Sequence, residues 1–193
     1  FEFSGVTFAG NKAEQGGGLH ADAPLAEDSS GILTKCTFTN NEAAAGAGLL
    51  IDDWFPSTVN IINCTFTDNI SKSTSEFTGT GFSALGGGAL LVDSRVIFDN
   101  CVFNGNTTED SGGGLVLAVE CEATVRDCTF SSNQSRIGGG GLLSSDSYVL
   151  VDDCSFIGNS TGNVNSIATV TDCTSVSPGY GGGLHFINGS AVV

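Results

Sequence analysis

The residues best suited to acid–base chemistry are two histidines and two adjacent aspartate pairs. They are His20, His185, Asp52-Asp53 and Asp152-Asp153. A glycosidase holds two carboxylates a few ångströms apart across the scissile bond. The histidines lie in the first and last copies of the repeat described below, and the aspartate pairs lie at different joints of it, so we expect neither set to meet. No Ser-His-Asp arrangement is visible. We therefore expect no catalytic residues, and a chain that is not an enzyme.

Seven cysteines could form disulfides or a metal site. Five of them recur at one position of the repeat: Cys36, Cys64, Cys101, Cys128 and Cys154. Equivalent side chains on stacked parallel strands point the same way and rarely reach disulfide geometry. Free cysteine behaves as a small buried hydrophobe, and no histidine stands at metal-ligand spacing, so we expect a core column and no metal site. Cys121 and Cys173 lie outside this column and are the disulfide candidates, with each other or with a column cysteine.

Six Asn-x-Ser/Thr sequons make the chain a candidate glycoprotein. Their asparagines are Asn63, Asn69, Asn106, Asn133, Asn159 and Asn188. A chain rich in Ser, Thr and Asn produces such sequons by chance. Four of the six belong to a column that we expect to turn the chain and to hydrogen-bond between coils, and a glycan could also fit at a turn. Both interpretations stay open at this point.

The charge of the chain is strongly one-sided. Six Lys and Arg face 21 Asp and Glu, for a formal net charge of −15. Such a chain repels nucleic acid and anionic membranes but not calcium or cationic partners. The loop carboxylates lack the alternating spacing of a calcium loop, so we expect no cofactor beyond weak calcium binding; they are Asp22, Glu27, Asp28, Glu109 and Asp110. No apolar run approaches the ~20 residues of a membrane span.

The elements that position these residues follow from an internal repeat. Six segments carry the pattern apolar-x-apolar-x-turn-Cys-x-Phe-x-x-Asn, with Val6 at the Cys position of the first. The Phe column is Phe8, Phe38, Phe66, Phe103, Phe130 and Phe156, and the Asn column is Asn11, Asn41, Asn69, Asn106, Asn133 and Asn159. A glycine-rich block such as Gly16-Gly17-Gly18-Leu19 follows each Asn. The copies are too short for a full helix and strand unit, and period-two alternation with turn residues at the joints indicates strands.

We therefore predict an all-β fold, a right-handed parallel β-helix (solenoid) of about six coils with three parallel sheets. No coil can bury its apolar face alone, whereas stacked coils place Phe on Phe and Cys on Cys. The residue before the Cys column is expected to turn a left-handed corner; these residues are Gly5, Lys35, Asn63, Asn100, Asp127 and Asp153. Residues 1–193 are expected to form a single domain, a fragment of a longer repeat protein with both ends uncapped.

The motifs resemble a known group of repeats. Phe8-x-x-Asn11 followed by Gly16–Leu19, with its five later copies, resembles the FxxN and GGA[ILV] repeats of the polymorphic outer membrane proteins of chlamydiae, and more loosely the pectin-lyase-like superfamily. The first resemblance implies a surface adhesin, and the second implies enzymes that cleave polysaccharides. The chain departs from the first group in its cysteine column and sequons. It departs from polysaccharide lyases because its Lys and Arg are scattered, with none beside an acidic cluster.

One apolar column on the glycine-block strands is expected to face outward. It comprises His20, Leu50, Leu90, Val116, Leu143 and His185. An apolar strip of this length is seldom left in water on a monomer. We expect either that two long insertions, residues 70–85 and 160–180, fold over it, or that a partner packs there, which makes the column a candidate interaction surface.

These observations favour an extracellular structural or adhesive repeat scaffold at a cell surface. Its expected partners are further coils of the same chain, other extracellular proteins or glycans, and not nucleic acid. The alternatives are a carbohydrate-binding or polysaccharide-cleaving β-helix and, as a minor one, an ice-binding solenoid. The ice-binding alternative depends on a row of outward Thr-x-Thr pairs, Thr37/Thr39 and Thr65/Thr67. This row is interrupted at Val102.

Overall fold

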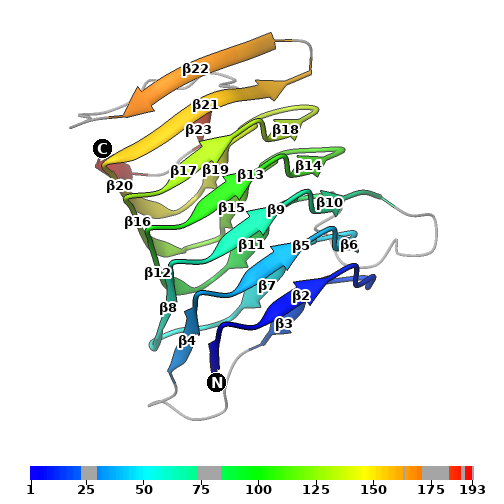
Figure 1. Cartoon of the computed structure of the whole chain (residues 1–193). Coiled ribbons are helices and arrows are strands. Elements are labelled where there is room, and N and C mark those ends of the chain that lie inside the picture. The colour runs from blue at the N-terminus through cyan, green and yellow to red at the C-terminus, as the bar shows by residue number, and fades with distance from the viewer. Residues whose placement is uncertain (23–29, 74–83, 163, 171–182, 188–189, 193) are drawn as a thin grey trace.

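The computed structural model describes residues 1–22, 30–73, 84–162, 164–170, 183–187 and 190–192. The described residues form no helix and build a right-handed parallel β-helix, in which the coils stack from the N-terminus upward (Figure 1). Six strands carry the Phe column, which confirms the prediction of about six coils. Each coil contributes a strand to three sheets, which we number 1 to 3.

Sheet 1 contains the alternating strands that precede the Cys column. Its order is β1 (Glu2–Ser4), β4 (Gly31–Thr34), β8 (Thr58–Ile62), β12 (Arg95–Asp99), β16 (Glu122–Arg126), β20 (Tyr148–Asp152) and β24 (Ser190–Val192). Its inward residues Leu33, Ile61 and Phe98 lie in register and are fully buried. The outward residues are polar or half-buried, as period-two alternation requires.

Sheet 2 contains the Phe column and the short strands after it. The column strands are β2 (Thr7–Ala9), β5 (Thr37–Thr39), β9 (Thr65–Thr67), β13 (Val102–Asn104), β17 (Thr129–Ser131) and β21 (Cys154–Thr161). The short strands are β6 (Glu42–Ala43), β10 (Ile70–Ser71), β14 (Thr107–Thr108) and β18 (Gln134–Ser135). The predicted outward Thr rank is present in this register and is interrupted at Val102 and Ile157.

Sheet 3 contains the strands of the glycine blocks. They are β3 (Leu19–Ala21), β7 (Leu49–Asp52), β11 (Ala89–Val92), β15 (Leu115–Ala118), β19 (Leu142–Ser145) and β23 (Leu184–Ile187). A Cβ at Gly88 would collide with the carbonyl oxygen of Gly114 in the next coil and touch the Phe103 ring. The block is glycine-rich because neighbouring coils approach backbone to backbone at this point.

The interior is built from stacked columns, as predicted. The Phe8, Phe38, Phe66, Phe103, Phe130 and Phe156 rings stack with centroids 4.6–4.8 Å apart and planes within 7°. The five column cysteines are buried free thiols beside them. Four of these thiols donate a hydrogen bond to a carbonyl of the preceding coil, as Cys101 Sγ does to Ile61 O at 3.3 Å.

The column asparagines form a continuous side-chain ladder inside the turn. Asn106 Nδ2 donates to Phe66 O and to Asn133 Oδ1, each at 2.9 Å, while Asn106 Oδ1 accepts from the backbone N and the Nδ2 of Asn69. The same pattern joins Asn41 to Asn69 and Asn133 to Asn159. All five asparagines from Asn41 onward have an exposed fraction of 0%. The ladder satisfies buried polar groups that would otherwise destabilise every turn.

The corners are left-handed where the sequence predicted them. Gly5, Lys35, Asn63, Asn100, Asp127 and Asp153 all have φ between 46° and 66°. Two further left-handed sets were not predicted. One lies two residues after each column Phe, at Gly10, Asn40, Asp68, Gly105, Ser132 and Gly158, and the other lies at the joint between sheets 3 and 1, at Asp53, Asp93, Glu120 and Asp146.

The three sheets are parallel as predicted, and one antiparallel strand is added at the end of sheet 2. Strand β22 (Val164–Val170) pairs antiparallel with β21 after a turn at Gly162, which has a φ of 55°, and lies over the end of the column (Figure 1). Glycine tolerates the left-handed turn that such a hairpin needs. At the other end Phe1 remains 38% exposed.

Candidate functional site

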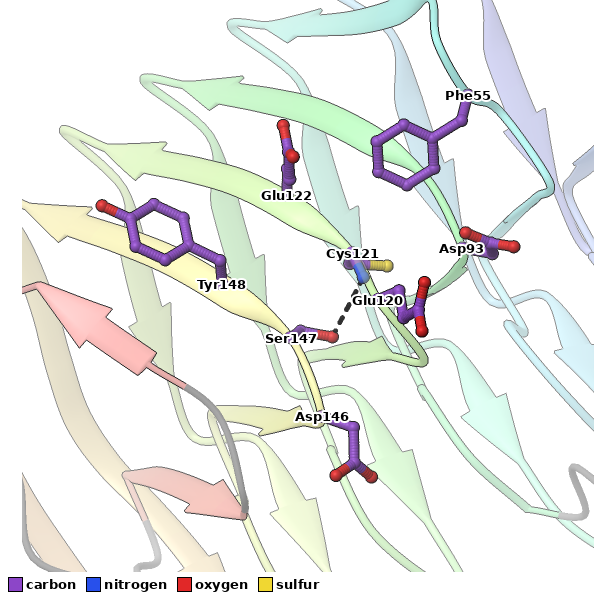
Figure 2. A pocket seen from close by; sticks show the side chains of 8 residues that line it. All are labelled: Phe55, Asp93, Glu120, Cys121, Glu122, Asp146, Ser147 and Tyr148. Atoms are coloured by element: carbon purple, nitrogen blue, oxygen red, sulfur yellow. Dashed lines mark hydrogen bonds between the residues drawn. The ribbon is translucent and has the colours of Figure 1, made fainter.

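The candidate site is an open groove along the joint between sheet 3 and sheet 1. It has a volume of about 640 Å³ and crosses four successive coils. Figure 2 shows its lining: Phe55, Asp93, Glu120, Cys121, Glu122, Asp146, Ser147 and Tyr148. We call it the joint groove. Phe55, in the segment between β7 and β8, forms one wall of the groove. The segments that join sheet 3 to sheet 1 in the next three coils form the other walls.

The acidic side of the joint groove is set by the left-handed joint residues. Asp93, Glu120 and Asp146 have φ of 42°, 54° and 49°. Backbone hydrogen bonds lock the joints onto each other, because Glu120 N donates to Asp146 O and Asp93 N donates to Val119 O, each at 2.8 Å. Since successive coils are one strand spacing apart, ~4.8 Å, the carboxylates form a row that follows the axis of the solenoid.

The side of the joint groove that faces sheet 1 is formed by one outward column of that sheet, together with the Phe55 ring. Arg95, Glu122 and Tyr148 pair directly on β12, β16 and β20. The Arg95 guanidinium lies 5.3 Å from the centroid of the Phe55 ring and 2.7 Å from the Glu122 carboxylate, and it also donates to Pro56 O. Tyr148 is 51% exposed. The site therefore has an aromatic ring at each end with a carboxylate beside it.

The electrostatics of the joint groove are unbalanced. Arg95 compensates Glu122, but no Lys or Arg of the described chain pairs with Asp93, Glu120 or Asp146. An open groove of this kind attracts cations and hydrogen-bond donors. The described residues nevertheless contain no group of three or more His, Cys, Asp or Glu arranged to hold a metal.

The floor of the joint groove contains Cys121 and Ser147. Ser147 Oγ accepts from Cys121 N at 3.2 Å, and Cys121 Sγ donates to Ala118 O at 3.3 Å. Burial raises the pKa of the Cys121 thiol to about 11. Cys121, a disulfide candidate in the sequence, is a free thiol in this structure, and Cys173 lies outside the described residues.

The six described cysteines should be unreactive in the folded protein. In a Cys173→Ser background, we expect no labelling by a soluble thiol reagent until denaturant is added, because the fold buries these thiols out of the reagent's reach. The reagent releases a chromophore when it reacts with a thiol, and the absorbance of this chromophore is measured before and after unfolding. Fast labelling of native protein would contradict the buried column.

The predicted interaction surface is corrected by the structure. The register of His20, Leu50, Leu90, Val116, Leu143 and His185 is as predicted. Leu50, Leu90, Val116 and Leu143 are nevertheless 0–6% exposed and form a second cluster with Ala45, Val92, Ala118 and Leu85, separate from the coil interior. The four apolar members are therefore not available to a partner. His20 is exposed, and the His185 side chain lies outside the described residues.

Burial of Leu50, Leu90, Val116 and Leu143 has a local cause. In the five blocks whose first glycine the structure describes, this glycine turns left-handed and brings the chain back against the outward side chain four residues later. Gly86, with φ of 63°, stands so close to Leu90 that an added Cβ would lie 2.9 Å from the Leu90 Cβ. Such folding back is invisible in a period-two pattern.

Four of the predicted glycosylation sites are also corrected. Asn69, Asn106, Asn133 and Asn159 are fully buried, and the Nδ2 that would carry the glycan is a donor in the ladder. Asn63 is exposed at a left-handed corner and accepts from Asn100 Nδ2 through its Oδ1. Asn188 lies outside the described residues.

Expression in a glycosylating eukaryotic host should show which of these asparagines can carry a glycan. In an Asn188→Gln background, we expect modification at Asn63 and none at the four ladder positions of the folded, secreted protein, because a glycan there would break buried hydrogen bonds. Mass spectrometry of peptides after enzymatic deglycosylation reads each site. A folded product with a glycan on Asn106 would contradict the ladder.

The acidic residues considered for catalysis and calcium are dispersed. Asp52 is half-buried, and burial, followed by the charges of Asp53 and Asp22, raises its pKa. Its acidic neighbour on another coil is thus Asp22 and not the Asp152-Asp153 pair. Glu109 accepts from Ser73 N, and Asp110 from Ser111 Oγ, while residues 27 and 28 lie outside the described part.

Sequence reasoning missed the joint groove, although a signal was present. Each glycine-block strand in the middle of the chain is followed by an acidic residue, at Asp53, Asp93, Glu120 and Asp146. The spacing from block to acid varies, so the column appears only when the joints are superimposed. Phe55 and Tyr148 have no repeated equivalents and could not be assigned to the same place.

The class defined by this geometry is a parallel β-solenoid with a lateral groove. Comparison with protein families matches residues 70–193, well over half of the chain, to the right-handed β-helix region, and the chain belongs to this family. Residues 5–22 match the repeat of the Chlamydia polymorphic membrane protein. The curated proteins and the solved structures gave no match. Both family matches are consistent with a surface-associated repeat protein. The described residues contain no helix able to cross a membrane.

Proposed function

We propose that this chain is an extracellular, adhesive repeat scaffold at a cell surface, and that the joint groove is its binding site. The observation that carries the proposal is the groove itself, a row of uncompensated carboxylates with an exposed ring on a rigid column. Long surface features on a rigid scaffold are where binding usually occurs. The buried Phe and Asn ladders supply the rigidity.

The proposal is tested by adhesion of coated beads. Beads carrying the chain should be retained on cultured cells or extracellular matrix, and the variant Glu120→Gln/Asp146→Asn/Tyr148→Ala should reduce retention by about tenfold, the effect of losing ~1.4 kcal/mol of binding free energy. The control Asp127→Asn/Asp153→Asn removes two carboxylates from left-handed corners of the same coils. No retention of the parent beads, or equal retention of all variants, would overturn the proposal. Antibody labelling of intact source cells tests the surface location.

A second candidate is polysaccharide cleavage at the same groove. Glu120 and Asp146 lie on adjacent coils in the lining of the groove, and a glycosidase needs a pair of carboxylates that flank the scissile bond. In this case neutral polysaccharides should release reducing ends in the presence of the chain, and Glu120→Gln alone should abolish the release. A chain that binds the polysaccharide without cleaving it would leave only the non-catalytic alternative.

A further inference from the structure

The outer face of sheet 1 carries a second, smaller hollow beside the joint groove. It has a volume of about 190 Å³. The side chains that line it stand on four successive strands, β8, β12, β16 and β20, and belong to two neighbouring outward columns of the sheet. They are Thr58, Arg95, Glu122 and Tyr148 in one column and Ile97 and Thr124 in the other. We call it the sheet 1 hollow.

The shape of the sheet 1 hollow follows from a difference in side-chain length. The long side chains of the first column form a wall, whereas Ile97 and Thr124, two residues further along the same strands, are short and form the floor. Figure 2 shows the Tyr148 ring on the sheet 1 side of Ser147, directed along β20 and away from Asp146. Tyr148 is 51% exposed, so its ring is accessible to a ligand in the hollow.

Polar groups with unused hydrogen-bonding capacity surround this floor. Arg95 Nε and Nη2 both lie 2.7 Å from Glu122 Oε2, and this ion pair holds the two side chains in place. Glu122 Oε1 has no partner among the described residues. The hydroxyls of Thr58, Thr124 and Tyr148 likewise make no hydrogen bond within the described chain. The hollow thus presents hydroxyl groups, a carboxylate oxygen and guanidinium N–H groups to a ligand.

The lining favours a ligand that is neutral, hydroxylated and apolar on one face. The opposite charges of Arg95 and Glu122 compensate each other, and the net charge of −15 repels anionic glycans. A volume of about 190 Å³ is below the ~300–1,000 Å³ of sites for drug-sized molecules, so the hollow accommodates a single ring. The hydroxyls at the edge of a sugar ring match the polar groups, and its C–H face matches an exposed aromatic ring.

We propose that the sheet 1 hollow binds one pyranose unit of a neutral glycan, with the C–H face of the sugar against the Tyr148 ring and its hydroxyls hydrogen-bonded to Arg95 and Glu122. The site lies beside the row of carboxylates named in the proposed function and adds a separate ligand to the scaffold. Because backbone pairing fixes the coils, the wall and the floor are formed before the sugar binds.

The test uses saturation-transfer NMR with neutral hexasaccharides of glucose, mannose, galactose or xylose, together with an oligogalacturonate, a chitosan oligosaccharide and a neutral Gly-Ser peptide. At least one neutral saccharide should receive saturation, strongest at its ring C–H protons, and its affinity should not change with ionic strength. Tyr148→Ala should weaken binding about fivefold because the stacked ring is lost, and Tyr148→Phe, which keeps the ring, should weaken it less. Thr124→Tyr places a large side chain on the floor of the hollow and should abolish binding.

The matched control is Thr129→Tyr, the same change at an outward position of the same coil but on sheet 2, and it should keep the affinity of the parent chain. Circular dichroism checks that each variant is folded. The sheet 1 site would be overturned if no neutral saccharide bound, if binding survived Thr124→Tyr, if the control lost as much, or if a charged glycan or the peptide bound in preference.

The joint groove is tested separately in the same assay. Glu120→Gln/Asp146→Asn should leave saccharide binding within about twofold, because neither residue lines the sheet 1 hollow. Loss of saccharide binding in this variant would place the sugar in the joint groove and overturn the sheet 1 site. Failure of bead adhesion while the neutral saccharide still binds would overturn the proposed function and leave this inference standing.

Discussion

Replacing Asn106 with alanine is expected to lower the free energy of unfolding by about 4 kcal/mol, because four buried side-chain hydrogen bonds are lost at ~1 kcal/mol each. The Asn69 amide and backbone N–H lose an acceptor, and Phe66 O loses a donor. These groups cannot turn to water, since the turn is fully buried. Chemical denaturation followed by circular dichroism measures the change.

The matched control for Asn106 is Asn104, on the outward side of the preceding strand. Asn104 is half-buried and accepts one hydrogen bond from Ser131 Oγ. Its replacement by alanine should cost less than about 1 kcal/mol. A similarly small loss for Asn106→Ala would show that the ladder does not hold the turns.

Replacing Phe103 with alanine should lower the free energy of unfolding by about 3–5 kcal/mol, the range for a large aromatic removed from a packed core. Its ring stacks 4.6 Å from Phe66 and 4.7 Å from Phe130, with an edge contact to Phe98. The neighbouring coils are locked by backbone pairing and cannot collapse into the cavity. Because each coil contacts only its neighbours, hydrogen exchange should rise most in β9, β13 and β17.

Two variants separate packing from other effects at Phe103. Phe103→Leu retains most of the volume and should cost about 1–2 kcal/mol. Val102→Ala changes the adjacent side chain, which is 38% exposed, and should be nearly neutral. An equal effect of Phe103→Ala and Val102→Ala would contradict the stacked column.

The joint groove does not contribute to the stability of the fold through its charges. Its carboxylates are not compensated within the described chain, so their negative charges do not favour the fold. Proteins commonly accept such local imbalance at functional sites. The stacked Phe and Asn columns supply the stability on which the groove is built.

The columns could be predicted from sequence because their chemistry repeats with every coil. A parallel solenoid places equivalent residues on one another, so Phe103 must meet Phe66 and Phe130 once the register is known. The left-handed corners were predicted for the same reason, since Asn, Asp and Gly recur before the Cys column. The antiparallel strand β22 was not predicted, because it belongs to no repeat.

What the sequence by itself determined is therefore the fold, its register and the identity of the core columns. Only the tertiary structure decided which polar and apolar side chains remain accessible. A sequon does not reveal that the Asn106 amide donates a hydrogen bond to Asn133 in the next coil. The alternation of apolar and polar residues does not reveal that the chain at Gly86 folds back over Leu90. Phe55, Arg95, Glu122 and Tyr148 come from different coils and share no motif. They meet because the joints of successive coils stack on one another. Residues at positions that do not repeat come close only in the folded chain, so the repeat pattern cannot predict their contact.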